Sequence, residues 1–189
     1  MFHRLSLFCF SLLVFLFWGS QRSYATASSP NGPGLFSWDD DLLENEEKGC
    51  QLFDTMLYHG LTVLYQYFPS DISSDISREF LRWASQRDIS VYLLNGSPDW
   101  ALDPQGGDML KIVRQAKKIN KNLEENERLA GILMDCEPYL LDQWDERKYE
   151  IMESYVDAMT SARRKASTAS LIYIACIPFY YDDMGLENQ

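Results

Sequence analysis

Two carboxylates, Asp135 and Glu137, lie two residues apart at the end of the apolar segment 129–134. If this segment is a β-strand, successive side chains alternate between its two faces. One face is then Ile132, Met134 and Cys136, and the other is Gly131, Leu133, Asp135 and Glu137. Carboxylates this close repel each other, which raises the pKa of one, so that it can hold a proton near neutral pH. General acid catalysis needs such a group. The alternative is that the pair caps the next helix or binds a loop.

The segment Gly131-Ile132-Leu133-Met134-Asp135-Cys136-Glu137-Pro138 resembles the fourth-strand signature of barrel glycoside hydrolases. Gly131, Asp135 and Glu137 match the chitinase-type family 18 pattern DGxDxDxE, whereas Ala130 and Leu133 stand where that family has aspartates. The segment is also similar to the Asn-Glu-Pro strand end of the large retaining glycosidase clan, with Cys136 in place of the Asn. The resemblance implies a carbohydrate substrate, with Glu137 as the general acid and Asp135 as its partner. The alternatives are a non-catalytic glycan-binding protein or an inactive fragment of a larger barrel enzyme.

Aromatic and polar side chains also follow the other strand candidates. If the strands are parallel, their ends meet at one rim, where rings can stack on sugars and amides can bind hydroxyl groups. The candidate substrate-binding residues are Trp38, Tyr65, Tyr67, Asn95, Trp100, Tyr139, Trp144 and Tyr180. For Tyr65 and Tyr67 the alternative is that their rings only fill the top of a core.

Strand and helix patterns alternate along the chain. The strand candidates are 35–38, 61–68, 89–94, 129–134 and 171–177, and the helix candidates are 40–60, 70–87, 108–126 and 142–165. Strict alternation predicts an α/β protein with parallel strands and right-handed crossovers. Both a (β/α)8 barrel and an open doubly wound sheet fit this order. The first strand is not followed by GxGxxG or a P-loop, which favours the barrel.

Length limits how much of a barrel to expect. A complete barrel takes about 250 residues, and five strand candidates occur in residues 35–189. We therefore expect a partial barrel domain, with about the first five β/α units of a TIM-barrel-like fold.

The N-terminus has the order of a secretory signal peptide. A short basic start is followed by the apolar run 5–19 and by Ala25-Thr26-Ala27, which predicts cleavage after Ala27. Residues 28–34 then form a linker. We expect a secreted protein that has no membrane segment after cleavage; the alternative is an uncleaved anchor.

The charge and the cysteine content limit which partners and cofactors we expect. The chain has 28 acidic and 17 basic residues, a net charge of -11, so nucleic acid is not an expected partner. Cys50, Cys136 and Cys176 lie outside the predicted signal peptide and show no metal-ligand spacing. They are expected to be small buried apolar residues. We expect neither a metal nor a cofactor.

Overall fold

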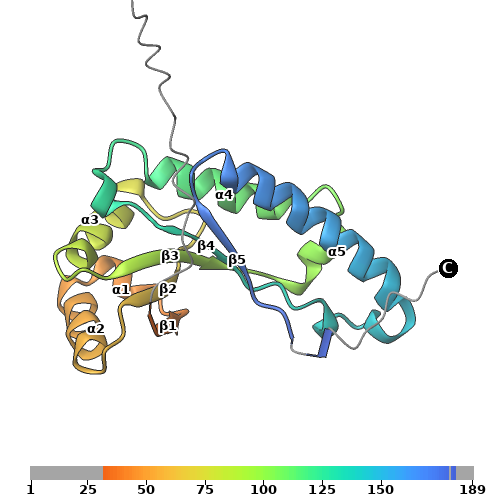
Figure 1. The fold of residues 1–189 in the computed structure, drawn as a ribbon, viewed down its shortest axis with the longest axis horizontal. Helices are drawn as coiled ribbons and strands as arrows, with labels where there is room; N and C mark the ends of the chain where they lie inside the picture. The colour runs from red at the N-terminus through yellow and green to blue at the C-terminus, as the bar shows by residue number, and fades with distance from the viewer. Residues whose placement is uncertain (1–31, 179, 182–189) are drawn as a thin grey trace, which may run out of the picture.

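The computed structural model describes residues 32–178 and 180–181 (Figure 1). The predicted signal peptide, 1–27, and residues 28–31 of the predicted linker lie outside the described residues. The predicted linker, 28–34, overlaps the first strand by one residue, because that strand begins at Gly34.

Five strands form one sheet. They are β1 (Gly34–Ser37), β2 (Val63–Tyr67), β3 (Ser90–Asn95), β4 (Gly131–Met134) and β5 (Ile172–Ala175). The sheet order is β1-β2-β3-β4-β5, and all four pairings are parallel. The predicted α/β class with parallel strands is thus confirmed.

Helices connect each strand to the next. They are α1 (Asp41–Glu44), α2 (Glu46–Tyr58), α3 (Ser74–Ser85), α4 (Gly107–Ile119) and α5 (Trp144–Ser167). Each of α2, α3 and α4 contacts the helix that follows it, and Figure 1 shows α4 and α5 side by side along one side of the sheet. Right-handed crossovers between consecutive neighbours place the helices on a single face. A doubly wound sheet instead reverses its strand order at a switch point, and the described strands do not.

Of the predicted helices, one is interrupted and another ends earlier than its apolar spacing suggests. The predicted helix 40–60 is broken at Asn45, which is extended (φ -112, ψ 98) and whose side chain accepts a hydrogen bond from the Lys48 N–H at 3.0 Å. The predicted helix 108–126 ends at Ile119. The Asn120 side chain accepts from the Leu129 N–H at 2.8 Å and donates to the Leu129 carbonyl at 3.0 Å. The Asn45 side chain thus caps the N-terminus of α2. The Asn120 side chain instead bonds to the backbone beyond α4, which competes with helix continuation.

The main core lies between the sheet and the helices. It contains Phe53 and Phe80 from the helices and Leu64, Leu93 and Ile132 from the strands. The opposite face of the sheet is also largely apolar near its centre, because Val63, Tyr92, Leu94 and Leu133 are buried outside this cluster. This second face is the one that continues into Asp135 and Glu137.

Candidate functional site

The predicted division of the β4 segment into two faces is confirmed. Ile132, Met134 and Cys136 belong to the core under the helices, and Asp135 and Glu137 alternate with them. Asp135 directly follows β4, and its N–H donates to the Asn95 carbonyl at 3.0 Å. Both carboxylates are half-buried at the carboxyl end of the sheet.

A glycine allows the ends of β3 and β4 to approach closely. A Cβ atom on Gly96 would lie 1.8 Å from the carbonyl oxygen of Asp135. No side chain fits at that distance, so position 96 needs a glycine. The backbone position of Asp135 therefore depends on the chain that follows β3.

The surroundings of Asp135 favour the protonated form of its carboxyl group. Burial raises its pKa above the usual 3.8, and the nearby Glu137 charge raises it further. The Cys176 thiol donates a hydrogen bond to the Asp135 carboxylate, which acts in the opposite direction. Cys176 directly follows β5 and is positioned by its N–H, which donates to the Met134 carbonyl at 3.0 Å.

Glu137 has a different partner. The Tyr139 hydroxyl donates a hydrogen bond to Glu137 Oε1, and this bond is the main reason that the pKa of Tyr139 rises to about 12. Asp135 and Glu137 can together hold one proton, and the Tyr139 hydroxyl, a neutral donor, holds Glu137 in place.

Aromatic rings extend from Tyr139 along one side of the acidic pair. Its ring centroid lies 6.2 Å from that of Tyr180, which lies 5.5 Å from Tyr181, and both pairs are edge-on. Trp144 stacks on Tyr181 at 6.2 Å with 16° between the ring planes. Tyr139, Trp144 and Tyr180 were predicted as binding residues; Tyr181 was not, although it lies in the aromatic stretch after the fifth strand.

A second group of rings lies on the same face of the sheet at β1 to β3. Tyr65 lies 4.8 Å from Phe36 and 5.4 Å from Tyr92, and Trp38 lies 5.5 Å from Tyr67. Phe36 and Trp38 are 47% and 49% exposed. The predicted residues Trp38, Tyr65 and Tyr67 thus come together.

Burial raises the pKa of Tyr65, and the Cys176 thiol, which follows β5, adds to this effect.

Two other predicted residues have structural partners instead. Asn95 is 9% exposed, and its Oδ1 accepts from the Gly96 N–H at 2.9 Å. Trp100 lies in the short 3-10 helix Pro98–Leu102 and packs half-buried against the core. Trp144 also packs against the core, in addition to its contact with Tyr181.

No protein-family model matches the chain, and no curated protein matches it either. Among the described residues, no helix is both long and apolar enough to cross a membrane.

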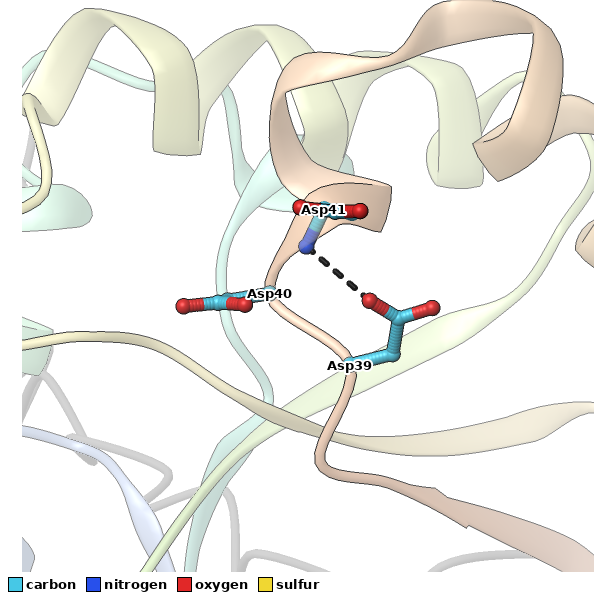
Figure 2. A group of neighbouring side chains, drawn as sticks. All are labelled: Asp39, Asp40 and Asp41. Atoms are coloured by element: carbon cyan, nitrogen blue, oxygen red, sulfur yellow. Dashed lines mark hydrogen bonds between the residues drawn. The ribbon is translucent and has the colours of Figure 1, made fainter.

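An exposed acidic group follows β1. Asp39, Asp40 and Asp41 have carboxylate oxygens within 4.8 Å of one another. Figure 2 shows the three side chains pointing in different directions, with Asp39 Oδ1 accepting from the Asp41 N–H at 3.1 Å. Asp41 also pairs with Lys48 at 3.2 Å. This geometry is a turn that opens α1, and acidic side chains are favourable at a helix N-terminus.

Two clefts lie away from the acidic pair. One, of about 790 Å³, is at the amino ends of β3 to β5 and is lined in part by Lys117, Lys121 and Arg128. The other, of about 740 Å³, is lined in part by Asp40, Glu44 and Asp71. Neither cleft includes Asp135 or Glu137, so the chemistry of the site rests on the pair and its rings.

Proposed function

We propose that the protein is an exported glycoside hydrolase-like protein that acts on a carbohydrate at the carboxyl end of β4. The observation that carries the proposal is the half-buried pair of Asp135 and Glu137. The pKa of Asp135 is raised, and Glu137 accepts a hydrogen bond from the Tyr139 hydroxyl. Such a pair holds one proton while keeping one negative charge. The partial match to the glycoside hydrolase strand signature adds a substrate class.

In the proposed reaction Glu137 is the general acid and Asp135 is its electrostatic partner. The pair shares one proton. Glu137 transfers it to the glycosidic oxygen as the bond from that oxygen to the anomeric carbon breaks. The charge that remains on the two carboxylates stabilises the positive charge that develops on the sugar ring. Water then supplies a hydroxyl group to the anomeric carbon and returns a proton to the pair.

The fold supports the same proposal. The consecutive order of the five parallel strands is compatible with an arc of a (β/α) barrel. Barrel enzymes carry their active sites at the carboxyl ends of the strands, where Asp135, Glu137 and Cys176 follow β4 and β5. The proposal that the protein is exported rests on the predicted signal peptide, residues 1–27. The secreted product is expected to begin at Ser28.

The test is Glu137→Gln, which keeps the shape of the side chain and removes its proton. Turnover of a panel of labelled glycans is expected to fall at least about 100-fold, which is typical for loss of a general acid. Glu153→Gln is the matched control, because Glu153 is exposed on α5, and it should leave turnover unchanged. Unchanged turnover in Glu137→Gln would exclude Glu137 as the acid.

A second candidate is a non-catalytic glycan-binding protein. The exposed rings of Phe36 and Trp38, which pack beside Tyr65 and Tyr67, favour it, because contiguous exposed apolar patches mark binding surfaces. In that case the wild type binds glycans without turnover, Trp38→Ala weakens binding, and Glu137→Gln leaves binding intact. The same panel of glycans therefore separates the two candidates.

A further inference from the structure

One side of α4 carries basic residues that no acid of the described residues neutralises. Arg114, Lys117 and Lys118 lie on α4, and Lys121 follows in the turn after it. Their spacing of i, i+3, i+4 and i+7 places them on one side of the helix, and all four are exposed. None forms an ion pair with another described residue, whereas Lys111, about one turn earlier, does. These four residues are the basic face of α4.

The helix dipole explains only part of this grouping. Cations are favourable near a helix C-terminus, but the effect falls off within the last turn. Lys117 and Lys118 lie in the last turn of α4, whereas Arg114 precedes that turn and Lys121 follows the end of the helix. In a chain with a net charge of -11, four unpaired cations on one helix face indicate a surface for an anionic partner.

The cleft at the amino ends of β3 to β5 lies beside the basic face. Lys117 and Lys121 line it, Arg128 adds a third cation, and Asp88 and Glu125 line it as well, so its lining has one net positive charge. The Nε of Arg128 donates to the Leu123 carbonyl at 2.9 Å. This bond holds the guanidinium group in place and leaves its two terminal nitrogens for a ligand. The volume of about 790 Å³ is within the usual range of ligand sites.

The lining of the cleft suits a ligand that has both anionic groups and hydroxyl groups. Lysine and arginine side chains only donate hydrogen bonds, and charged carboxylates only accept them. Asp88 and Glu125 can therefore accept from sugar hydroxyl groups while the basic side chains bind anionic groups. Ser90 and Ser170 add exposed hydroxyl groups of their own. No described residue that lines the cleft is aromatic, so the cleft offers no ring on which a nucleobase could stack.

The cations form a narrow row and not a broad basic surface. From Arg114 to Lys121 the row is roughly 10 Å long, at about 1.5 Å per residue, and Glu124 and Glu125 follow it closely. A flat anionic membrane would meet these carboxylates as well as the cations, and would repel them. A linear chain can follow the row alone, because one helical turn of about 5.4 Å is close to the length of one sugar residue.

We propose that the basic face of α4 and the adjoining cleft bind a linear polysaccharide that carries carboxylate groups, built from uronic acid units. The carboxylates of the sugar chain pair with Lys117, Lys121 and Arg128 through charge-assisted hydrogen bonds. The site lies at the opposite end of the strands from Asp135 and Glu137, so the inference does not depend on the proposed activity of that pair.

The test measures binding of the purified protein, by calorimetry, to a galacturonate oligomer and to a glucose oligomer of equal length. The galacturonate oligomer is expected to bind at least about tenfold more tightly at low salt, because each exposed contact between opposite charges contributes a factor of up to about 5. Raising the salt concentration from 10 to 100 mM should remove most of this difference, because the Debye length shortens from about 30 to about 10 Å. Equal affinity for the two oligomers at low salt, or no binding of galacturonate, would overturn the inference.

Charge-matched double variants show where the preference arises. Lys117→Gln with Lys121→Gln removes two cations that line the cleft and should weaken galacturonate binding about tenfold at low salt. Lys48→Gln with Lys148→Gln makes the same change in net charge, from -11 to -13, at positions that do not line this cleft, and should leave the affinity unchanged. An equal loss of affinity in both doubles would show that net charge alone attracts the oligomer and would overturn the inference.

Two other polyanions test whether the surface is specific for a sugar chain. They are vesicles of phosphatidylcholine and phosphatidylserine in equal amounts, and a single-stranded DNA with the same charge as the galacturonate oligomer. Both should bind more weakly than galacturonate, because the vesicle surface is flat and the cleft has no ring for the bases. Tighter binding of either one, lost in the Lys117→Gln and Lys121→Gln double, would assign the surface to a membrane or to nucleic acid and overturn the inference.

Discussion

Asp135 and Glu137 share one strand end, but each is held by a different donor. Cys176 donates to Asp135, and Tyr139 donates to Glu137. The first donor comes from the neighbouring strand, whereas the second comes from two residues along the chain. A thiol is a weak donor, so it offsets only part of the burial and repulsion that act on Asp135. The two carboxylates are therefore electrostatically unequal, which an acid and its partner require.

The raised pKa of Asp135 has a consequence for stability. Because the folded protein binds this proton more tightly than the unfolded chain, the contribution of Asp135 to stability is fully present below pH 3.8. It is lost as the pH rises through the higher folded pKa. Asp135→Asn, which cannot ionise, should therefore gain stability over the wild type as the pH rises from 3 to 7.

Urea unfolding across this pH range measures the effect. The control is Asp145→Asn, which removes an exposed carboxylate from the first turn of α5. It should lose about 0.3–1 kcal/mol at pH 7, because that charge is favourable at the helix N-terminus. A stability difference between Asp135→Asn and the wild type that does not change with pH would contradict the electrostatic account.

At the scale of elements, the close approach of β3 and β4 positions the acidic pair. Gly96→Ala would place a methyl group inside the backbone of Asp135, 1.8 Å from its carbonyl oxygen and 2.3 Å from its carbonyl carbon. Backbone atoms cannot rotate away as a flexible side chain can, so the strand ends must separate. We expect a loss of about 3 kcal/mol in the free energy of unfolding, at the upper end for overpacking.

Gly60→Ala is the comparison for this variant. Gly60 has a φ of +71° with no atom within 4 Å of an added Cβ, so the variant pays only for its backbone conformation, about 1 kcal/mol. Chemical unfolding of both variants separates steric from conformational cost. If Gly96→Ala were no less stable than Gly60→Ala, the inference that the two strand ends pack tightly would be wrong.

The elements were predictable from the sequence to different degrees. Each of the five strands was predicted within two residues of its observed bounds, because β-branched and aromatic residues concentrate there between turn signals. Helix ends were predicted less well, since Asn45 caps the N-terminus of α2 and Asn120 bonds to the Leu129 backbone after α4. Apolar spacing does not reveal these side-chain bonds.

The site shows a similar division. Strand alternation alone was enough to predict that Asp135 and Glu137 share a face. The contact between Cys176 and Asp135 depends on the register of β4 and β5, in which Met134 pairs with Ala175. Register is a tertiary property, and no pattern within one strand contains it. The positions of Trp100 and Asn95 likewise depend on what packs against them.

At the scale of the whole molecule, the two ends of the strands differ in charge. Asp99, Asp135 and Glu137 lie beyond the carboxyl ends. The cleft at the amino ends is lined by Lys117, Lys121 and Arg128 and by two acidic residues, Asp88 and Glu125. Helices that run antiparallel to the strands favour this pattern, since acidic residues suit their N-termini and basic residues their C-termini. The acidic residues nevertheless exceed the basic ones, by 28 to 17.

This excess predicts that salt stabilises the protein. Repulsion among the surplus carboxylates opposes the compact state, and raising the salt concentration from 10 to 100 mM shortens the Debye length from about 30 to about 10 Å. The ion pairs of the described residues are the opposing effect. Most are exposed i,i+3 pairs such as Arg82–Glu79 and Lys111–Asp108, and each contributes only about 0–1 kcal/mol. We therefore expect the Tm to rise with salt by about 2–4 °C, equivalent to about 1 kcal/mol for a chain of this size.

Variants that change the net charge test the cause of this rise. Lys117→Gln with Lys121→Gln takes the net charge from -11 to -13, and neither lysine forms an ion pair with another described residue. This double variant should melt at a lower temperature in 10 mM salt and gain more from added salt. Asp39→Asn with Asp40→Asn takes the net charge to -9 and should gain less. If Tm instead fell with salt in all three proteins, the surface ion pairs would outweigh the repulsion between surplus carboxylates, and the acidic excess would not be what limits stability.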